Sequence, residues 1–283
     1  MSSTPPPSSS PDPPTLSTIL ISHLSPTTIL LTYNLPKISN AFTLQSYHDL
    51  RTALLWTLSL PKITTILLTG AGRHYCAGKV LIPPSAGGPT IAQEIAAGTA
   101  LAEVLNESFP KILIAAVNGA AIGWGCTQLT NFDLVYASTN AFFQTPFMKL
   151  GFVPEGGSSY TFPRLMGRQH AARLLVGSER VSAKEMYVSG LVTEVIEDGG
   201  DRDVFLEKVC KIAVMIGGYS EESLRVVKEL MRPGEGEVLE RRKAGEKERV
   251  ALQRVLSGEG ASRAMEQFAG RVKGGGNGSS SKL

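Results

Sequence analysis

The sequence predicts an α/β protein with a mainly parallel sheet, whose last third is a layer of helices. Up to about residue 160, short apolar runs that stop at Gly or Pro alternate with segments in which apolar residues recur at helical spacing. After that point the successive segments have helical period and composition. The length of 283 residues is ample for a buried core, either as one large domain or as a domain with an appendage.

Strands and helices alternate in the first part of the chain. The apolar runs at residues 27–36, 63–70 and 111–119 have the length and composition of strands. Between them, residues 38–60 and 89–109 carry apolar side chains at helical spacing. This order of elements is typical of a parallel sheet whose strands are connected by helices.

The middle of the chain continues the alternation, and the last third does not. Residues 120–132 are expected to turn into a helix, and the runs "DLVYAS" and "AFFQTP" to form two short strands. Beyond them, helices are expected for "GRQHAARLLVG", "SAKEMYVSG", "DVFLEKVCKIAVMIGG", "SEESLRVVKELMR" and "VLERRKAGEKERVALQRVLSG". The stretch 235–250 is heavily charged, which is typical of a helix face in solvent or between subunits.

Composition divides the chain into four parts. Residues 1–15 are a Pro/Ser-rich tail that cannot pack a core, so we expect it to be disordered. Residues 16–210 form the α/β core, and residues 211–272 form a C-terminal helical region. Residues 273–283 are a flexible Gly/Ser-rich tether that ends in the tripeptide SKL.

The last three residues, Ser281, Lys282 and Leu283, match the carboxyl-terminal address that sends proteins to the peroxisome. The tether in front of them makes this tripeptide accessible. We therefore predict a peroxisomal protein that has the import receptor as a partner. The N-terminal tail lacks a basic region followed by an apolar run, so it is not a secretory signal.

Several other classes of protein are disfavoured by composition. The 28 basic residues are scattered among 25 acidic ones, with a net charge of +3 and no basic stripe, so nucleic acid is not an expected partner. The longest apolar runs are strand-sized, far below the roughly 18 residues of a membrane span. Cys76, Cys126 and Cys210 form no CxxC pair, and the four histidines lack metal-ligand spacing. We therefore expect neither a disulfide framework nor a metal site.

Three segments join the end of an apolar strand to glycines; they cover residues 67–81, 115–129 and 148–162. The second segment matches neither the dinucleotide fingerprint nor the P-loop, because its glycines have the wrong spacing and no G-K-[ST] follows. Such turns expose unpaired N–H groups at helix N-termini, where negative charge is favoured. Two of these N–H groups converging on one oxygen would form an oxyanion hole, and simple tight turns are the alternative.

The sequences of these segments resemble those of the enoyl-CoA hydratase/isomerase (crotonase) family. The resemblance rests on "HYCAGK", "NGAAIGWGCTQLTNFDLVYAS" and "FQTPFMKLGFVPEGGSSYTFPRLMG". The third stretch is especially similar to the peroxisomal Δ3,Δ2-enoyl-CoA isomerase branch. The similarity extends from about residue 16 to about residue 215, and beyond that the helices match in character rather than in sequence.

This resemblance implies a spiral of ββα repeats with C-terminal helices, assembled as a homotrimer or a dimer of trimers. Members of the family bind acyl-CoA thioesters without a separate cofactor, because coenzyme A is part of the substrate. Two backbone amides polarise the thioester carbonyl, and by position these belong to Lys79 and Trp124. Further residues expected along the substrate are Ala77, Gly78, Gly123, Phe147 and Phe152.

The resemblance also distinguishes two reactions by their carboxylates. Hydratases of the family hold and activate water with two glutamates, and the matching positions here are Thr127 and Phe147. The isomerase branch uses a single glutamate in the later turn, where this chain has Glu155. Moving a double bond from C3 to C2 needs one base that removes a proton from C2 and returns it at C4. The resemblance therefore implies that Glu155 is the catalytic acid/base.

From its sequence neighbours alone, Glu155 is either such a base or a solvated turn residue. The three residues before it, Phe152 to Pro154, are apolar, and no Lys or Arg lies within eight residues downstream. Burial in such surroundings would raise the pKa of the carboxyl group toward neutrality. Ser158 and Ser159 are expected to cap the helix that begins after Gly157.

Three positions depart from the family pattern. Val80 stands where the family commonly has Asp, so the loop at residues 78–90 is expected to be reshaped. The side chain of Lys79 either meets a CoA phosphate or a polar acyl group, or is solvated. The indole of Trp124 either narrows the acyl pocket or fills the core.

Three functions follow from this reasoning. The leading one is a peroxisomal enoyl-CoA isomerase, in β-oxidation of unsaturated fatty acids or in a secondary-metabolite pathway. The second is an enoyl-CoA hydratase, or another reaction of the family that uses Glu155 alone. The third is a non-catalytic acyl-CoA-binding or assembly subunit.

Overall fold

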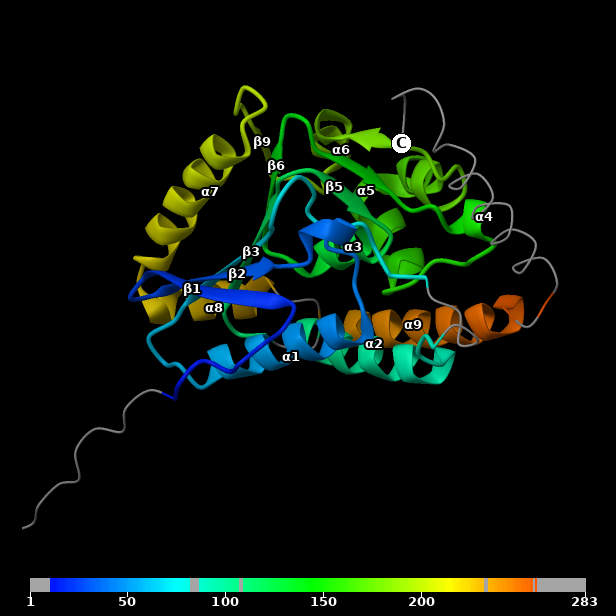
Figure 1. Cartoon of the computed structure of the whole chain (residues 1–283), viewed down its shortest axis with the longest axis horizontal. Helices are drawn as coiled ribbons and strands as arrows, with labels where there is room; N and C mark the ends of the chain where they lie inside the picture. Colours follow the sequence, from blue (N-terminus) through cyan, green and yellow to red (C-terminus); the bar gives the residue numbers. More distant parts are fainter. Residues whose placement is uncertain (1–10, 82–86, 107–108, 232–233, 257, 259–283) are drawn as a thin grey trace, which may run out of the picture.

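A six-stranded sheet forms the centre of the protein (Figure 1). The computed structural model describes residues 11–81, 87–106, 109–231, 234–256 and 258. The strands follow the spatial order β1 (Ile19–Ser25), β2 (Thr28–Tyr33), β3 (Thr65–Gly70), β4 (Ile112–Val117), β6 (Leu134–Ser138) and β9 (Glu194–Ile196). Only the β1–β2 pair is antiparallel within this sheet, and the other neighbours are parallel. The predicted α/β fold with a mainly parallel sheet is confirmed.

A second, smaller sheet lies beside the first. It consists of β5 (Ala120–Ile122), β7 (Phe142–Gln144) and β8 (Val181–Ser182). β5 pairs in parallel with β7, and β7 pairs in an antiparallel manner with β8. Because β5 comes directly after β4, the chain passes from one sheet to the other within three residues.

Helices cover both faces of the central sheet (Figure 1). α1 (Leu44–Leu58) and α2 (Ile91–Asn106) pack together on one face, and α7 (Arg202–Gly217) packs on the other. The strands between them are buried on both sides, since Ile66 and Leu68 of β3 face the α1/α2 side whereas Leu67 faces α7. Such two-sided burial is the reason why these strands read as continuous apolar runs in the sequence.

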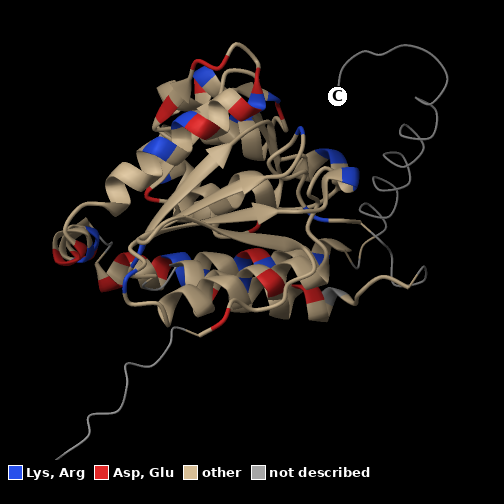
Figure 2. Ribbon diagram, turned by 60° about the vertical axis from the view of Figure 1, so that its left-hand side comes forward, with Lys and Arg blue, Asp and Glu red and all other residues tan. Residues whose placement is uncertain are grey.

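The remaining helices complete the layers. They are η1 (Pro36–Ile38), α3 (Trp124–Thr127), η3 (Gln128–Asn131), α4 (Phe147–Leu150), α5 (Ser158–Leu175), α6 (Ala183–Ser189), α8 (Glu221–Met231) and α9 (Glu235–Leu256), where η denotes a 3-10 helix. α9 lies beside α2 and also contacts α5. In Figure 2, acidic and basic residues are interspersed along the helices at the bottom of the view, as the mixed charge of the sequence predicts.

The structure contains strands that the sequence pattern did not reveal. β1, β8 and β9 were not expected, and β9 lies within the part of the chain that was predicted to be helical. β8 and β9 are two and three residues long, too short to show a period of their own, and each is defined by its pairing partner. The helix expected over residues 120–132 is divided into β5, α3 and η3.

Some expectations lie outside the described residues. These are most of the N-terminal tail, the middle of the loop at 78–90, the end of the C-terminal helical region, the tether and the SKL tripeptide. Within the described residues, none of the helices is long and apolar enough to span a membrane. The same residues contain no cluster of three or more His, Cys, Asp or Glu side chains that could hold a metal ion.

Candidate active site

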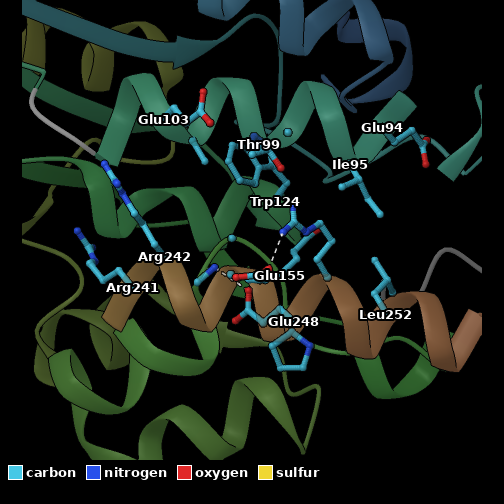
Figure 3. A pocket seen from close by; sticks show the side chains of 18 of the residues that line it. Glu94, Ile95, Thr99, Glu103, Trp124, Glu155, Arg241, Arg242, Glu248 and Leu252 are labelled. Atoms are coloured by element: carbon cyan, nitrogen blue, oxygen red, sulfur yellow. Dashed lines mark hydrogen bonds and ion pairs between the residues drawn. The ribbon is translucent and has the colours of Figure 1, made fainter. Parts of the chain in front are cut away.

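A cavity of about 520 Å³ lies between α2 and α9. Its walls come from these two helices, from the turn that carries Lys79, from the start of α3 and from the turn before α5. In Figure 3, Glu155 lies between the ribbons of the two helices, with Arg241 and Arg242 toward one end of the cavity and Leu252 toward the other. The cavity is large enough for a small organic ligand.

Two glycine turns meet at the inner wall of this cavity. Gly78 has φ +87° and Gly123 has φ +53°, conformations that residues with a side chain rarely adopt. A Cβ atom on Gly78 would lie 2.9 Å from the carbonyl oxygen of Ile122, and one on Gly123 would lie 3.6 Å from Cα of Gly78. The turns are joined by a hydrogen bond of 2.9 Å from the amide of Ile122 to the carbonyl of Cys76. Glycine at both positions therefore allows two backbones to touch.

This arrangement leaves two backbone amides available. The carbonyl of Gly78 and the amide of Val80 both bond to Phe42, at 2.7 and 2.9 Å, so the N–H of Lys79 between them points the opposite way. Trp124 is the first residue of α3, and N–H groups at that position have no partner within their helix. Among the described residues, neither amide donates a hydrogen bond.

Glu155 lies in the turn that faces these amides. An ideal Cβ on Gly123 would be 3.9 Å from Oε1 of Glu155, so the carboxylate lies against the second glycine turn. Burial raises the pKa of Glu155 to about 7, in agreement with the expectation from its apolar neighbours. Its carboxylate makes no hydrogen bond or ion pair within the described part of the chain. Both oxygens are therefore free to exchange a proton with a ligand.

Charged side chains around Glu155 partly offset one another. Lys79 lowers the pKa of Glu155, whereas Glu248 and Glu94 raise it. The ammonium of Lys79 forms an ion pair with Glu94 of α2, and the two side chains are only 26% and 15% exposed. The Lys79 side chain is therefore held by a neighbouring helix, an arrangement that local sequence did not indicate.

Trp124 both fills the core and lines the cavity. Its side chain is 4% exposed, and its ring lies 5.7 Å from that of Tyr47 and 6.4 Å from that of Phe42. The residue also forms part of the cavity wall. The indole therefore packs in the core at the edge of the cavity, and its narrowing of an acyl pocket stays a prediction.

The positions that hydratases of the family fill with glutamate have no carboxylate here. Thr127 is buried in α3, and a Cβ on Gly156 would lie 3.2 Å from its Oγ1, so Thr127 adjoins the turn of Glu155. Phe147 is buried at the start of α4 as part of the main apolar core. Neither side chain can remove a proton from water.

The turn after Glu155 differs from the expectation in one respect. Gly156 and Gly157 have φ of +68° and +75°, and α5 begins at Ser158 with Gly157 as N-cap. The hydroxyls of Ser158 and Ser159 do not cap this helix, and Ser158 Oγ is buried without a partner in the described residues. Instead, the carboxylate of Glu248 in α9 accepts hydrogen bonds from the backbone amides of Gly157 and Ser159 at the start of α5. The prediction of serine capping was wrong because the capping side chain, Glu248, is distant in sequence. It lies 91 residues after Gly157 and 89 residues after Ser159.

Of the residues singled out from the sequence, the structure places Lys79, Trp124 and Glu155 together in the cavity wall. Gly78 and Gly123 lie directly behind them, and the amide of Ala77 bonds to Ser39 at 3.0 Å on the far side of the turn. The other two predicted substrate contacts, Phe147 and Phe152, pack with the core rather than in the cavity wall.

Residues that sequence reasoning missed come from helices distant in the chain. Tyr47, Glu94, Arg241 and Glu248 all line the cavity. Arg241 and Glu248 sit on a helix rich in charged residues, so nothing in their sequence neighbourhood distinguishes them from solvated side chains. Tyr47 belongs to the apolar face of α1, and neither its neighbours nor those of Glu94 in α2 indicate a cavity.

The chain is similar to known proteins over most of its length. The sequence model of the family described as enoyl-CoA hydratase/isomerase matches residues 25–273. Enoyl-CoA delta isomerase 2 of Rattus norvegicus is 39% identical over 213 residues, which cover 74% of this chain and 53% of that protein. The peroxisomal enoyl-CoA delta isomerase 3 of Mus musculus is 35% identical over 74% of this chain and 65% of its own length. The chain thus spans only about half to two thirds of these two relatives.

The chain is also similar to a protein named for a different reaction, and to solved structures. Mevalonyl-coenzyme A hydratase sidH of Aspergillus fumigatus is 32% identical over 78% of this chain and 80% of its own length. The crystal structure of an enoyl-CoA hydratase/isomerase from Pseudoalteromonas atlantica has a TM-score of 0.77 at 29% identity, covering 90% of this chain and 98% of that one. The predicted fold of this family, with its C-terminal helical region, is confirmed.

The two glycines after Glu155 allow a matched test of the turn. We expect Gly157→Ala to cost about 1–2 kcal/mol in the free energy of unfolding, because only the left-handed backbone is strained and no atom lies within 4 Å. Gly156→Ala should cost roughly 1–3 kcal/mol more, since its Cβ would press on Thr127 and Trp124. Denaturant unfolding of both variants measures the difference, and equal costs would show that the turn can relax away from α3.

Proposed function

The chain belongs to the enoyl-CoA hydratase/isomerase family, and we propose that within it this protein is an enoyl-CoA isomerase. It moves the double bond of a 3-enoyl-CoA to the 2-trans position, with Glu155 as the single acid/base. The observation that carries this proposal is the position of Glu155. Its unpartnered carboxylate, with a pKa of about 7, lies beside two free amides, while the hydratase positions hold Thr127 and Phe147.

The reaction starts with the thioester carbonyl oxygen at the amides of Lys79 and Trp124. The carboxylate of Glu155 takes a proton from C2, a double bond forms between C1 and C2, and the negative charge collects on the thioester oxygen while the C3–C4 double bond stays in place. Two N–H groups directed at that oxygen stabilise this dienolate, and such donors lower a barrier by several kcal/mol in a site that excludes water. The protonated Glu155 then delivers the same proton to C4, the thioester carbonyl re-forms, and the remaining double bond lies between C2 and C3 in the conjugated product.

A pKa near neutrality suits both proton transfers. The carboxylate must be basic enough to remove a proton from C2, and the carboxylic acid must be acidic enough to return it at C4. Burial of Glu155 provides this balance, because it disfavours the charged form of the side chain. The ion pair between Lys79 and Glu94 limits the opposing effect of the lysine charge.

A second candidate is hydration of an enoyl-CoA, or another reaction of the family that uses Glu155. The similarity to the mevalonyl-coenzyme A hydratase of Aspergillus fumigatus favours it. The ion pair at the cavity wall would also suit an acyl chain that carries a polar group. The absence of a second carboxylate at Thr127 and Phe147 speaks against the usual two-glutamate hydration.

We place the reaction in the peroxisome, in β-oxidation of unsaturated fatty acids or in a secondary-metabolite pathway. The terminal Ser281-Lys282-Leu283 supports this location, as does the similarity to a peroxisomal isomerase. Coenzyme A enters as part of the substrate, and no separate cofactor is needed for this chemistry. A homotrimer, or a dimer of trimers, is the assembly that we propose from the family resemblance.

Replacement of Glu155 by Gln tests the catalytic proposal. With a 3-enoyl-CoA, the wild-type protein should produce the conjugated 2-enoyl-CoA, followed by ultraviolet absorbance, and Glu155→Gln should lower kcat by roughly 100- to 10 000-fold. Thermal unfolding near the wild-type temperature would show that the fold is kept. Retention of activity in this variant would remove Glu155 from the mechanism. Formation of 3-hydroxyacyl-CoA from a 2-enoyl-CoA would favour the hydratase, and binding without turnover would favour a non-catalytic subunit.

The pH dependence of the wild-type enzyme follows from the pKa of Glu155. Because the base must start ionised, kcat/KM should fall as the pH decreases below about 7, the pKa of the free enzyme's carboxyl group. An unperturbed glutamate would keep its activity to about pH 4.3. A profile that stays flat down to pH 5 would contradict a buried, neutral-range base.

Targeting is tested with the last ten residues alone. A fluorescent protein that ends in "GGGNGSSSKL" should gather in peroxisomes of a eukaryotic cell, because the import receptor reads the free C-terminal tripeptide. The matched control is the same fusion without Leu283, which should stay in the cytosol. A cytosolic distribution of both fusions would overturn the peroxisomal location.

A further inference from the structure

The buried residue of α9 is a glutamate. Among the residues of this helix that the structure describes, Glu248 alone is buried, and it is 7% exposed. The rest of α9 is rich in charged side chains that remain at least partly accessible. A buried carboxylate is costly unless the protein provides hydrogen bonds to it, so its position calls for a specific partner.

Glu248 finds this partner at the N-terminus of α5. Its Oε2 accepts from the amide of Gly157 at 2.7 Å, and its Oε1 accepts from the amide of Ser159 at 2.8 Å. Amides at the start of a helix lack partners within the helix and favour negative charge. The N-cap of α5 is Gly157, which has no side chain to offer, so Glu248 supplies the cap from another helix.

The capped amides belong to the turn that carries Glu155. Gly157 is two residues from Glu155, and the amide of Ser158 bonds to the carbonyl of Glu155 at 3.1 Å. Gly156 and Gly157 both have left-handed φ angles, so the connection has more conformational freedom than an ordinary turn. Two charge-assisted hydrogen bonds, which the amides of Gly157 and Ser159 donate to Glu248, reduce that freedom on the side of the turn that faces α9.

We propose that Glu248 is a positioning residue for Glu155. It fixes the turn so that the carboxylate of Glu155 is directed into the cavity beside the two free amides, where C2 and C4 of the substrate would lie, and its negative charge acts on the acid/base from the α9 side. This inference rests on the proposed function of Glu155 as the acid/base. It makes α9 part of the machinery that holds the reacting group, in addition to being a wall of the cavity.

The charged side chains that line the cavity together with Glu155 are Lys79, Glu94, Glu103, Arg241, Arg242, Glu246, Glu248 and Arg249. Burial raises the pKa of Glu248 itself, and the hydrogen bonds that it accepts at the N-terminus of α5 lower it. The negative charges of Glu248 and Glu94 raise the pKa of Glu155, and the positive charge of Lys79 lowers it. Tyr47 and Cys76 also lie close, but burial raises the pKa of Cys76 to about 12 and that of Tyr47 well above its usual value, so both stay neutral near pH 7. Loss of the Glu248 charge should therefore lower the pKa of Glu155.

The central variant is Glu248→Gln, which keeps the size of the side chain but has one acceptor oxygen and turns an NH2 group toward the other amide. We expect kcat to fall about tenfold or more through misplacement of Glu155, with KM changed less than about threefold. The acid limb of the pH profile should move to lower pH. Glu240→Gln, which removes an exposed charge from the same helix, is the matched control and should match the wild type in both properties.

A second variant separates geometry from charge. Glu248→Asp keeps the negative charge but is one methylene shorter, so it cannot reach both amides. It should lower kcat while leaving the acid limb close to that of the wild type. A purely structural cap would lower the melting temperature in both variants without moving the acid limb in Glu248→Gln, and that result would overturn the proposal.

A measurement without turnover distinguishes this inference from the proposed function. The carbon-13 shift of the Glu155 carboxyl group, followed by NMR over pH in wild type and Glu248→Gln, gives the pKa directly. A lower pKa in the variant supports the role of Glu248, and an unchanged pKa contradicts it. Absence of isomerase activity in the wild type would refute the isomerase instead, whatever this titration shows.

Discussion

The close approach of two glycine turns is the contact on which the candidate site depends. β3 and β4 are neighbouring parallel strands, so their carboxyl ends lie at one edge of the sheet, where ligand sites of α/β proteins are commonly found. The turns that follow, around Gly78 and Gly123, touch through backbone atoms with no side chain between them. Any larger residue at either position would push apart the amides of Lys79 and Trp124. The geometry of these amides is therefore a property of the backbone.

The carboxylate of Glu155 is buried close to two other acidic side chains, and each of those two is bound by a partner distant in the sequence. Glu155 is disfavoured as an anion by burial, and Glu94 and Glu248 add to that effect. Each of these two acids is in turn held by its own partner, Lys79 in one case and the α5 amides in the other. Of the three, only Glu155 has no hydrogen bond or ion pair at either carboxylate oxygen within the described residues. This difference among the three carboxylates supports the proposal that Glu155 is the one that exchanges a proton with the substrate.

Sequence reasoning reached the parts of this site that depend on local pattern. The apolar runs of β2, β3 and β4, the helices α1 and α2, and the glycine turns all follow from residues close together in the chain. Family resemblance then singled out Glu155, Lys79 and Trp124, which the structure brings to one cavity. The ion pair of Lys79 with Glu94 and the cap from Glu248 were missed, because both join segments whose proximity only the tertiary fold determines. The serine cap failed for the same reason: a tertiary partner took the place of a local one.

The fold itself does not decide which reaction occurs at this site, since isomerases and hydratases share it. What differs is which side chains surround the same pair of amides. With Thr127 and Phe147 in place of carboxylates, a water molecule at that side of the cavity would have no base to activate it. With Glu155 held in a turn that two glycines allow and that α9 stabilises, a proton can be moved between two carbons of one bound chain. In the proposed mechanism, the placement of the base therefore depends on a helix from the far end of the sequence as much as on the glycine turns themselves.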